Sequence, residues 1–426
     1  MRVFVNYLIL SLYFFVFITP QYIDPIFLAF DRVFPQMFLI SLINIIFFIY
    51  IIKIFNFKEL VSNFKHRKHF LSFFFVVVIS SISLIVADNF NEGVVSLVKL
   101  INLFLAYSFI MIIAFSRNFN IYNYFIIVTV ISLFIESVVI NIDVIESVII
   151  NGNLLNRSNA YAGLGANINI SSFSVLMKTI VPIYFLFNYK NTIIKLVSCF
   201  LIASSFLTIM LLMSRAAIIA LSLVFISITL LSVLANKKKY FFANGLVILS
   251  LSISIFTYNL INEKNAYNII GERFSNVTNP IADGSVKERL NFYTTSAKSI
   301  IDNPMLGIGL GNWKIKSIDL SKDIIISYRV PYFVHNDFLQ MAAEIGIIGG
   351  LCFVFFIFYP LWISFKNTIQ HFRFDLDFMI FLIFLVYIID SMLNFPFARP
   401  MNLMYLFFTI ILFYKSEKYY LKWEDC

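Results

Sequence analysis

The sequence predicts an all-α polytopic membrane protein with about twelve transmembrane helices. Hydrophobic residues make up 60% of the 426 residues, charged residues only 13%, and the mean hydropathy is +0.88. Apolar runs of about 17–25 residues recur along almost the whole chain, and this is the length that a helix needs to cross a bilayer. Lysine and arginine gather in alternate loops between these runs. Residues 1–426 are therefore expected to form a single integral membrane domain.

Twelve apolar segments account for the expected helices. The first, residues 3–19, follows one basic residue, Arg2, and no small-residue cleavage site comes after it. We therefore expect a retained helix and not a removed signal peptide. The segments run at about 3–19, 37–54, 70–87, 94–115, 124–142, 170–187, 194–213, 216–235, 241–260, 338–360, 378–395 and 401–414.

Basic residues in the loops predict the orientation of the helices. One set of loops is rich in lysine and arginine, whereas the alternate short loops carry little more than Arg32, Arg157 and Arg399. Because cytoplasmic loops are enriched in basic residues, we expect the first set and both termini to face the cytoplasm. The net charge of +9 follows these loops and gives no indication of nucleic-acid binding. The basic set is Lys53, Lys58, Lys65, Arg67, Lys68, Arg117, Lys190, Lys195, Lys237, Lys238, Lys239, Lys366, Arg373, Lys415, Lys418 and Lys422.

Two loops on the outward side are long, at about residues 143–169 and 262–334. Long loops of this kind are commonly functional. The second loop is expected to contain an amphipathic helix, because Ser285 and Glu288 have the spacing of a capping box and apolar residues then recur at helical intervals. Arg289 would lie in the first turn of this helix. The recurring residues are Val286, Leu290, Tyr293, Ala297 and Ile301.

Two further patterns give no indication of a cofactor or a metal ion. The glycine-rich segment from Pro304 to Trp313 superficially resembles a dinucleotide-binding loop, but no predicted strand precedes it and no predicted helix begins at it. We expect a turn there. Cys199, Cys352 and Cys426 lie far apart in the sequence and form no metal or redox motif.

The segment from Tyr328 to Gly350 joins the long polar loop to an apolar helix. Pro331 restricts the backbone before the helix, and we expect His335, Asn336 and Asp337 in its first turn, where unpaired backbone N–H groups favour an anion. A polar stripe then follows one side of the helix. Such a stripe either lines a functional site or contacts neighbouring helices, and these residues alone leave both interpretations open. The stripe consists of Asn336, Asp337, Gln340 and Glu344.

Several charged residues lie within or beside the expected spans. Arg215 follows Ser214 between two apolar segments, where it either reaches lipid headgroups or binds a phosphate with its planar guanidinium. Its position alone favours the first role. Charged groups inside a membrane bundle usually pair with one another, and we expect pairing of the others, whose individual roles the sequence leaves open. These are Lys99, Lys178, Glu136 and Asp390.

The run F-V-H-N-D-F-L-Q-M-A-A-E-I-G-I-I-G-G resembles the signature of the bacterial O-antigen ligase and polymerase family, in which His-Asn precedes Glu-x-Gly-x-x-Gly at this spacing. Three further features are similar to that family: the pair Ser214-Arg215, Arg289 in the long outward loop, and a Pro-x-x-Gly-x-Gly turn before Trp313. The resemblance covers about residues 213–350. The region of Asn167 and Asn169 also resembles the family's polar start of the next helix, without indicating which asparagine matters.

The resemblance implies a membrane glycosyltransferase of the C type that takes a glycan from undecaprenyl pyrophosphate on the periplasmic side of the bacterial inner membrane. A ligase of this family passes the glycan to a sugar of lipid A–core, and a polymerase passes it to another lipid-linked repeat. By this resemblance Arg215 and Arg289 would bind the donor pyrophosphate and His335 would act at the acceptor hydroxyl, with Asn336 and Asp337 also at the substrate. Two arginines can neutralise a pyrophosphate without a metal ion, so no metal and no cofactor are expected.

Two alternatives remain open. A lipid-oligosaccharide flippase or other transporter would be expected to show paired repeats and polar residues near the middle of the membrane. This chain places its polar residues at the outer surface beside one large loop, which favours an enzyme. Between a ligase and a polymerase, the match at Arg215, Arg289 and His335 favours the ligase, while the glycan, the acceptor sugar and the oligomeric state are not predicted.

Overall fold

The computed structural model describes residues 2–19, 33–54, 68–114, 120–146, 163–165, 167–261, 284–320 and 331–424. Every regular element in those ranges is a helix, which confirms the prediction of an all-α protein. Arg157, residues 262–283 and residues 321–330 lie outside the described residues.

The twelve expected membrane segments each correspond to a helix. Among the described residues, nine helices are long and apolar enough to cross a membrane by length and composition. These are α4 (Lys68–Ser83, continued by the 3-10 turn η1, Leu84–Val86), α5 (Phe90–Ala114), α6 (Ile121–Ile145), α7 (Ile168–Asn188), α8 (Thr192–Leu212), α9 (Arg215–Ala235), α10 (Lys238–Ile261), α14 (Asp337–His371) and α15 (Leu376–Leu393). The other three contain shorter apolar stretches and are α1 (Arg2–Ile18), α2 (Phe34–Ile54) and α16 (Pro400–Glu424).

Helices α7 and α16 form the centre of the bundle. Almost all of α7 is buried, and every residue from Met401 to Tyr414 in α16 is buried. The surrounding helices expose large apolar side chains such as Phe48, Ile193 and Phe256. Exposed apolar surface on this scale is typical of a protein surrounded by lipid.

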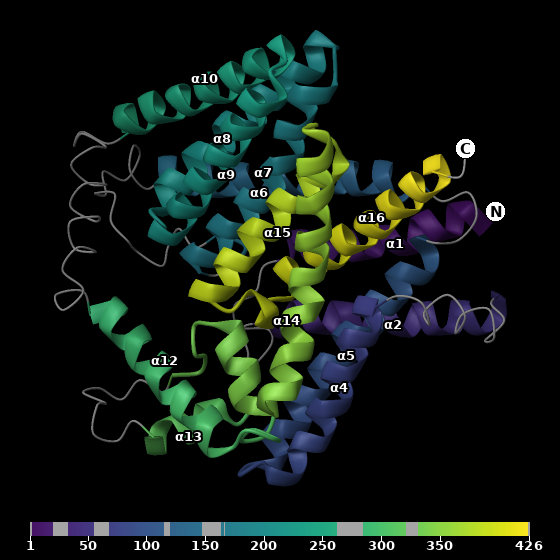
Figure 1. Cartoon of the computed structure of the whole chain (residues 1–426), viewed down its shortest axis with the longest axis vertical. Helices are drawn as coiled ribbons and strands as arrows, with labels where there is room; N and C mark the ends of the chain where they lie inside the picture. Colours follow the sequence, from purple (N-terminus) through teal and green to yellow (C-terminus); the bar gives the residue numbers. More distant parts are fainter. Residues whose placement is uncertain are drawn as a thin grey trace.

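The start of α1 and the end of α16 lie at the same edge of the molecule, away from α12 (Gly284–Asp302). Figure 1 shows these two helix ends at one edge and α12 at the opposite edge. For the described part of the long loop, residues 284–320, this arrangement agrees with the prediction that both termini face one side and the loop the other.

The long loop contains the expected amphipathic helix, with one correction. Helix α12 begins at Gly284, one residue before Ser285, so Arg289 lies in the second helical turn and not in the first. The side chain of Ser285 lies outside the described residues, so the capping box itself is not tested. A second short helix, α13 (Trp313–Leu320), follows the glycine-rich segment.

Helix α14 differs from its prediction in length and in continuity. It runs from Asp337 to His371 and has a non-helical residue inside it, Gly346, with φ 78° and ψ 173°. The hydropathy pattern does not show this break because the sequence on both sides of it is apolar. The segment Asp337–Ile345 is therefore a short helix of its own, ahead of the longer part of α14.

The expected pairing of buried charges is confirmed for Glu136 and Lys178. Lys178 Nζ lies 2.7 Å from Glu136 Oε2, and the two side chains are 1% and 0% exposed. The hydroxyl of Ser174 donates to the same oxygen at 3.1 Å. Asp390 is also buried and accepts hydrogen bonds from the side-chain amides of Asn394 and Asn402.

Candidate active site

His335 lies just before α14 and not in its first turn as the sequence predicted. Asn336 is the N-cap residue, and its side-chain oxygen accepts a hydrogen bond from Leu339 N at 3.0 Å. His335 has φ 61°, in the left-handed region that residues other than glycine rarely adopt. Such a conformation persists only when the surrounding structure holds it, and it is commonly found at functional sites.

The imidazole ring of His335 lies between aromatic side chains from two elements. The Phe292 ring of α12 is nearly parallel to it, with ring centroids 6.3 Å apart and an angle of 12°. Phe395, after α15, meets it edge-on at 5.0 Å. Within the described part of the chain, the buried Nδ1 atom of His335 has no hydrogen-bond partner. The ring is thus held by packing, with Nδ1 unsatisfied.

Two arginines and burial lower the pKa of the His335 ring. Burial is the main factor that lowers the pKa of His335, and the positive charges of Arg289 and Arg399 lower it further, to about 4. His335 is therefore neutral at physiological pH. A neutral imidazole can accept a proton, which a charged one cannot.

Arg399 also lies at this site, although the sequence indicated it only as a basic residue in a short outward loop. It lies between α15 and α16, and its guanidinium carbon is 4.8 Å from the ring centroid of Phe395 and 6.0 Å from that of Phe333. These two rings stack on each other with centroids 4.2 Å apart. The reversal of the chain between α15 and α16 brings Arg399 to His335, and no local motif in the sequence indicates it.

Asp337 connects the start of α14 to the segment that carries Arg399. It is 4% exposed, and its Oδ2 atom accepts a hydrogen bond from Phe397 N at 3.0 Å. Phe397 belongs to the 3-10 turn η4 (Pro396–Ala398), two residues before Arg399. The described contacts of Asp337 thus go to the protein, and its expected contact with substrate stays a prediction.

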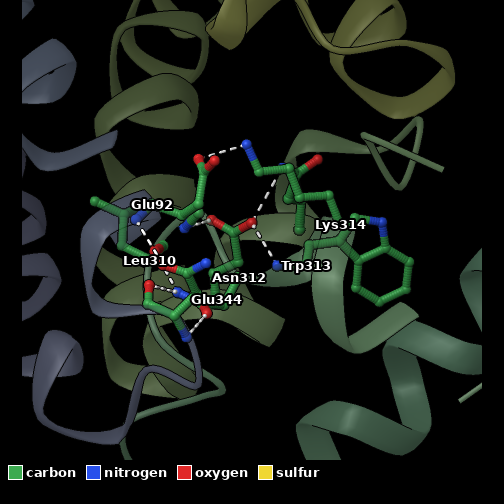
Figure 2. Close-up of polar contacts among 9 residues, drawn as sticks. Glu92, Leu310, Asn312, Trp313, Lys314 and Glu344 are labelled. Atoms are coloured by element: carbon green, nitrogen blue, oxygen red, sulfur yellow. Dashed lines mark hydrogen bonds and ion pairs between the residues drawn. The ribbon is translucent and has the colours of Figure 1, made fainter. Parts of the chain in front are cut away.

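Glu344 is buried and fastens the glycine-rich segment to α14. Its Oε2 atom accepts a hydrogen bond from Gly311 N at 2.8 Å. Its Oε1 atom accepts hydrogen bonds from Trp313 N and from the side-chain amide of Gln340, each at 3.3 Å. Figure 2 shows Glu344 among the residues of this segment. The carboxylate oxygens of Glu344 are therefore both used within the protein.

The glycine-rich segment is a turn, as predicted, and it inserts into the break of α14. Ile308 N donates to Ala343 O, and Ile347 N donates to Pro304 O, both at 2.9 Å. A Cβ atom added at Gly346 would lie 2.2 Å from Met305 O, far too close. The glycine of Glu-x-Gly and the Pro-x-x-Gly-x-Gly turn thus fit each other at backbone level.

The same turn contacts the connection between α4 and α5. The side-chain oxygen of Asn312 accepts a hydrogen bond from Asn89 N at 2.7 Å. Lys314 Nζ lies 2.6 Å from Glu92 Oε2, and Lys316 Nζ lies 3.2 Å from Asp88 Oδ2; Figure 2 shows the Lys314–Glu92 pair. The connection between α4 and α5 therefore also supports the turn.

Arg215 belongs to a second group of polar residues, at the ends of α7, α8 and α9. It is the first residue of α9, directly after the N-cap Ser214. The Ser214 hydroxyl donates to Asn169 Oδ1 at 2.9 Å, whereas Asn167 caps α7. The structure thus associates Asn169, and not Asn167, with the Ser-Arg pair. The charges that lower the pKa of His335 come from Arg289 and Arg399, so the structure brings together His335 and Arg289, and Arg215 is not among these charges.

No group of three or more His, Cys, Asp or Glu side chains within the described ranges is placed to hold a metal ion. This observation covers only part of the chain and leaves the expected metal-independent reaction untested.

The comparison with protein families matches residues 199–354 to the family described as O-antigen ligase. The matched segment contains Arg215, Arg289, His335 and both halves of the turn and helix break. The comparison with curated proteins gives no match.

Proposed function

We propose that this protein, whose residues 199–354 match the family described as O-antigen ligase, transfers a glycan from undecaprenyl pyrophosphate to a sugar hydroxyl of lipid A–core. The observation that carries the proposal is the position of His335 at the start of α14, where burial and the nearby charge of Arg289 lower its pKa. His335 can accept a proton, and Arg289 can bind an anion. These are the two tasks of a metal-independent transfer from a lipid pyrophosphate.

Arg289 and Arg215 are proposed to bind the donor pyrophosphate. A guanidinium offers a planar fork of N–H donors that matches phosphate oxygens, and it keeps its charge at every physiological pH. As the bond between the sugar and the pyrophosphate breaks, negative charge grows on the leaving oxygen. Fixed positive groups near that oxygen stabilise the transition state.

His335 is proposed to act as the general base. The acceptor hydroxyl oxygen attacks the anomeric carbon of the donor sugar, and His335 accepts the hydroxyl proton. The bond from the anomeric carbon to the pyrophosphate breaks, and its electron pair leaves with undecaprenyl pyrophosphate. Asn336 and Asp337 are proposed to lie at the substrate as well, in addition to the capping and connecting contacts described above.

The site is proposed to face the periplasm of a bacterial inner membrane. Support comes from the basic loop Lys237–Lys239, which is expected in the cytoplasm, and from the placement of both chain ends away from α12. Single cysteines at the exposed positions Asp302 and Lys238, in a variant without Cys199, Cys352 and Cys426, can be probed with an impermeant thiol reagent in intact spheroplasts. We expect labelling at Asp302 only, and labelling at Lys238 only would reverse the orientation.

A transfer assay with purified protein in nanodiscs tests the function. The donor is an undecaprenyl-pyrophosphate-linked glycan, and the acceptor is either lipid A–core or a second lipid-linked repeat. We expect transfer to lipid A–core. Transfer only to the second repeat would identify the alternative, a repeat-unit polymerase of the same family. Movement of the donor across a vesicle membrane without any transfer would indicate a flippase and would refute the proposed enzyme.

A further inference from the structure

The backbone of His335 needs support on both sides because its left-handed conformation is unfavourable for a residue with a side chain. On its N-terminal side, Val334 N donates a hydrogen bond to the side-chain oxygen of Gln340 at 3.2 Å. Gln340 lies on the first part of α14, one helical turn after Asn336. It therefore reaches back over the start of its own helix to the residue that precedes His335.

Gln340 is itself held by Glu344. Its side-chain nitrogen lies 3.3 Å from Glu344 Oε1 and donates to it. Glu344 in turn accepts the backbone N–H groups of Gly311 and Trp313. A chain of hydrogen bonds thus runs from the glycine-rich turn through Glu344 and Gln340 to Val334, the neighbour of His335.

Glutamine suits the middle position of this series of hydrogen bonds because the end of its side chain carries both an acceptor and a donor. The acceptor is needed by Val334 N and the donor by the carboxylate of Glu344. A glutamate at position 340 would place a second carboxylate against Glu344. A methionine would fill the space without making either hydrogen bond.

We infer that Gln340 and Glu344 are positioning residues for His335, which hold the backbone on its N-terminal side, and that these two members of the polar stripe act through the protein and not on the substrate. This inference rests on the proposed function because it takes His335 as the proton acceptor. A misplacement of a reacting group by about 1 Å can lower a rate ~10²-fold. Loss of the Gln340 contacts should therefore slow transfer without weakening donor binding.

Three variants test the inference in single-turnover transfer at saturating donor, with donor binding and the thermal midpoint measured separately. Gln340→Met should lower the transfer rate by ~10- to 100-fold at unchanged donor Kd. Gln340→Glu should lower it as well. The exchange Gln340→Glu with Glu344→Gln should recover part of the loss. In this double variant the new amide at position 344 can donate to the new carboxylate at position 340, which still accepts from Val334 N. Recovery is only partial because the amide nitrogen at position 344 cannot accept from Trp313 N, as Glu344 Oε1 does.

Asn367 provides a matched control on the same helix. Its side-chain amide donates to Asp377 Oδ2 at 3.2 Å, far along the chain from His335. Asn367→Leu removes one amide–carboxylate hydrogen bond, as Gln340→Met does, but should leave the transfer rate unchanged. A loss of rate in both variants would show a general effect of a loosened α14 and would overturn the positioning role.

The outcomes separate this inference from the proposed function. If the parent protein shows no transfer, the proposed function fails and the inference fails with it. If the parent transfers glycan and Gln340→Met transfers at the parent rate, only the inference fails. If Gln340→Met does not fold, the comparison of Gln340→Glu with the exchanged pair decides, and equal rates in those two overturn the inference.

Discussion

The hydroxyl group of Tyr293 on α12 lies 3.1 Å from the backbone carbonyl oxygen of His335 and donates a hydrogen bond to it. The same hydroxyl lies 3.0 Å from the carbonyl oxygen of Met392, so its proton is shared between the start of α14 and the end of α15. Arg289 and Phe292 lie on the same helix, about one turn or less before Tyr293. A single face of α12 therefore supplies a charge, a ring contact and a backbone contact to His335.

Tyr293→Phe should slow glycan transfer while leaving donor affinity unchanged. The variant keeps the ring and removes only the hydroxyl, and a typical hydrogen bond contributes about 0.5–1.5 kcal/mol. We expect a fall in rate of up to ~10-fold. Tyr240→Phe is the control, because the Tyr240 hydroxyl accepts from Phe374 N in another part of the bundle. If both variants keep the parent rate, the Tyr293 contact does not support His335.

Lysine should replace Arg289 and Arg215 poorly if both bind pyrophosphate. An ammonium group keeps the charge but lacks the fork of donors. Loss of one such contact in the transition state costs about 2–4 kcal/mol, which corresponds to ~10²–10³ in rate. Arg373→Lys, in an exposed turn before α15, should have no effect. A nearly neutral Arg215→Lys would instead support contact with lipid headgroups, and full activity of both variants would refute donor binding by this pair.

Gly346→Ala should destabilise the protein. The φ of 78° at this position disfavours a side chain by about 1–3 kcal/mol, and the new Cβ would collide with Met305 O at 2.2 Å. We expect a clear fall in the thermal midpoint in detergent. Gly245→Ala is the matched control, because it lies within α10 and a Cβ there meets nothing within 4 Å. Equal midpoints for the two variants would mean that the turn does not depend on the break in α14.

Removing one partner of the Glu136–Lys178 pair should also destabilise the bundle. Lys178→Met leaves a buried carboxylate without its cation, and the loss of one partner of a buried ion pair costs about 3–5 kcal/mol. The double variant Glu136→Gln with Lys178→Met should recover much of this loss. A double-mutant cycle on the thermal midpoint measures the coupling. Additive effects would show that the two residues stabilise the bundle independently.

The sequence was sufficient to predict the helices but not the way they meet at the site. Hydropathy located all twelve apolar helices because each must satisfy its own backbone within the membrane. It did not show the break at Gly346, because the residues on both sides are apolar. The sequence named Arg399 and Glu344 but did not predict their contacts, since Arg399 lies 64 positions from His335 and Glu344 binds a turn more than thirty residues earlier. Such relationships depend on tertiary packing, whereas the family resemblance alone indicated His335 and Arg289.

The acid side of the pH profile tests the role of His335 most directly. A general base must be neutral, and the pKa of about 4 keeps His335 neutral down to mildly acid pH. Activity should therefore stay level from pH 7 to about 5 and fall as the pH drops through about 4. Protonation of His335 should lower the stability of the protein as well as its activity. Between the ordinary pKa of 6.5 and about 4, the unfolded chain binds a proton that the folded protein does not, so the free energy of unfolding decreases over this window as the pH falls.

Arg289 supplies the control for this profile. Arg289→Gln removes one of the two positive charges that lower the pKa of His335, so the acid limb of kcat/KM should move to higher pH. Arg289→Lys keeps the charge, and its limb should stay in place even though its rate is lower. His335→Gln cannot accept a proton near neutrality and should transfer ~10²–10⁴-fold more slowly, with donor binding retained and the acid limb lost. If His335→Gln keeps both its rate at saturation and the limb, the limb belongs to another group and His335 is a structural residue at the start of α14.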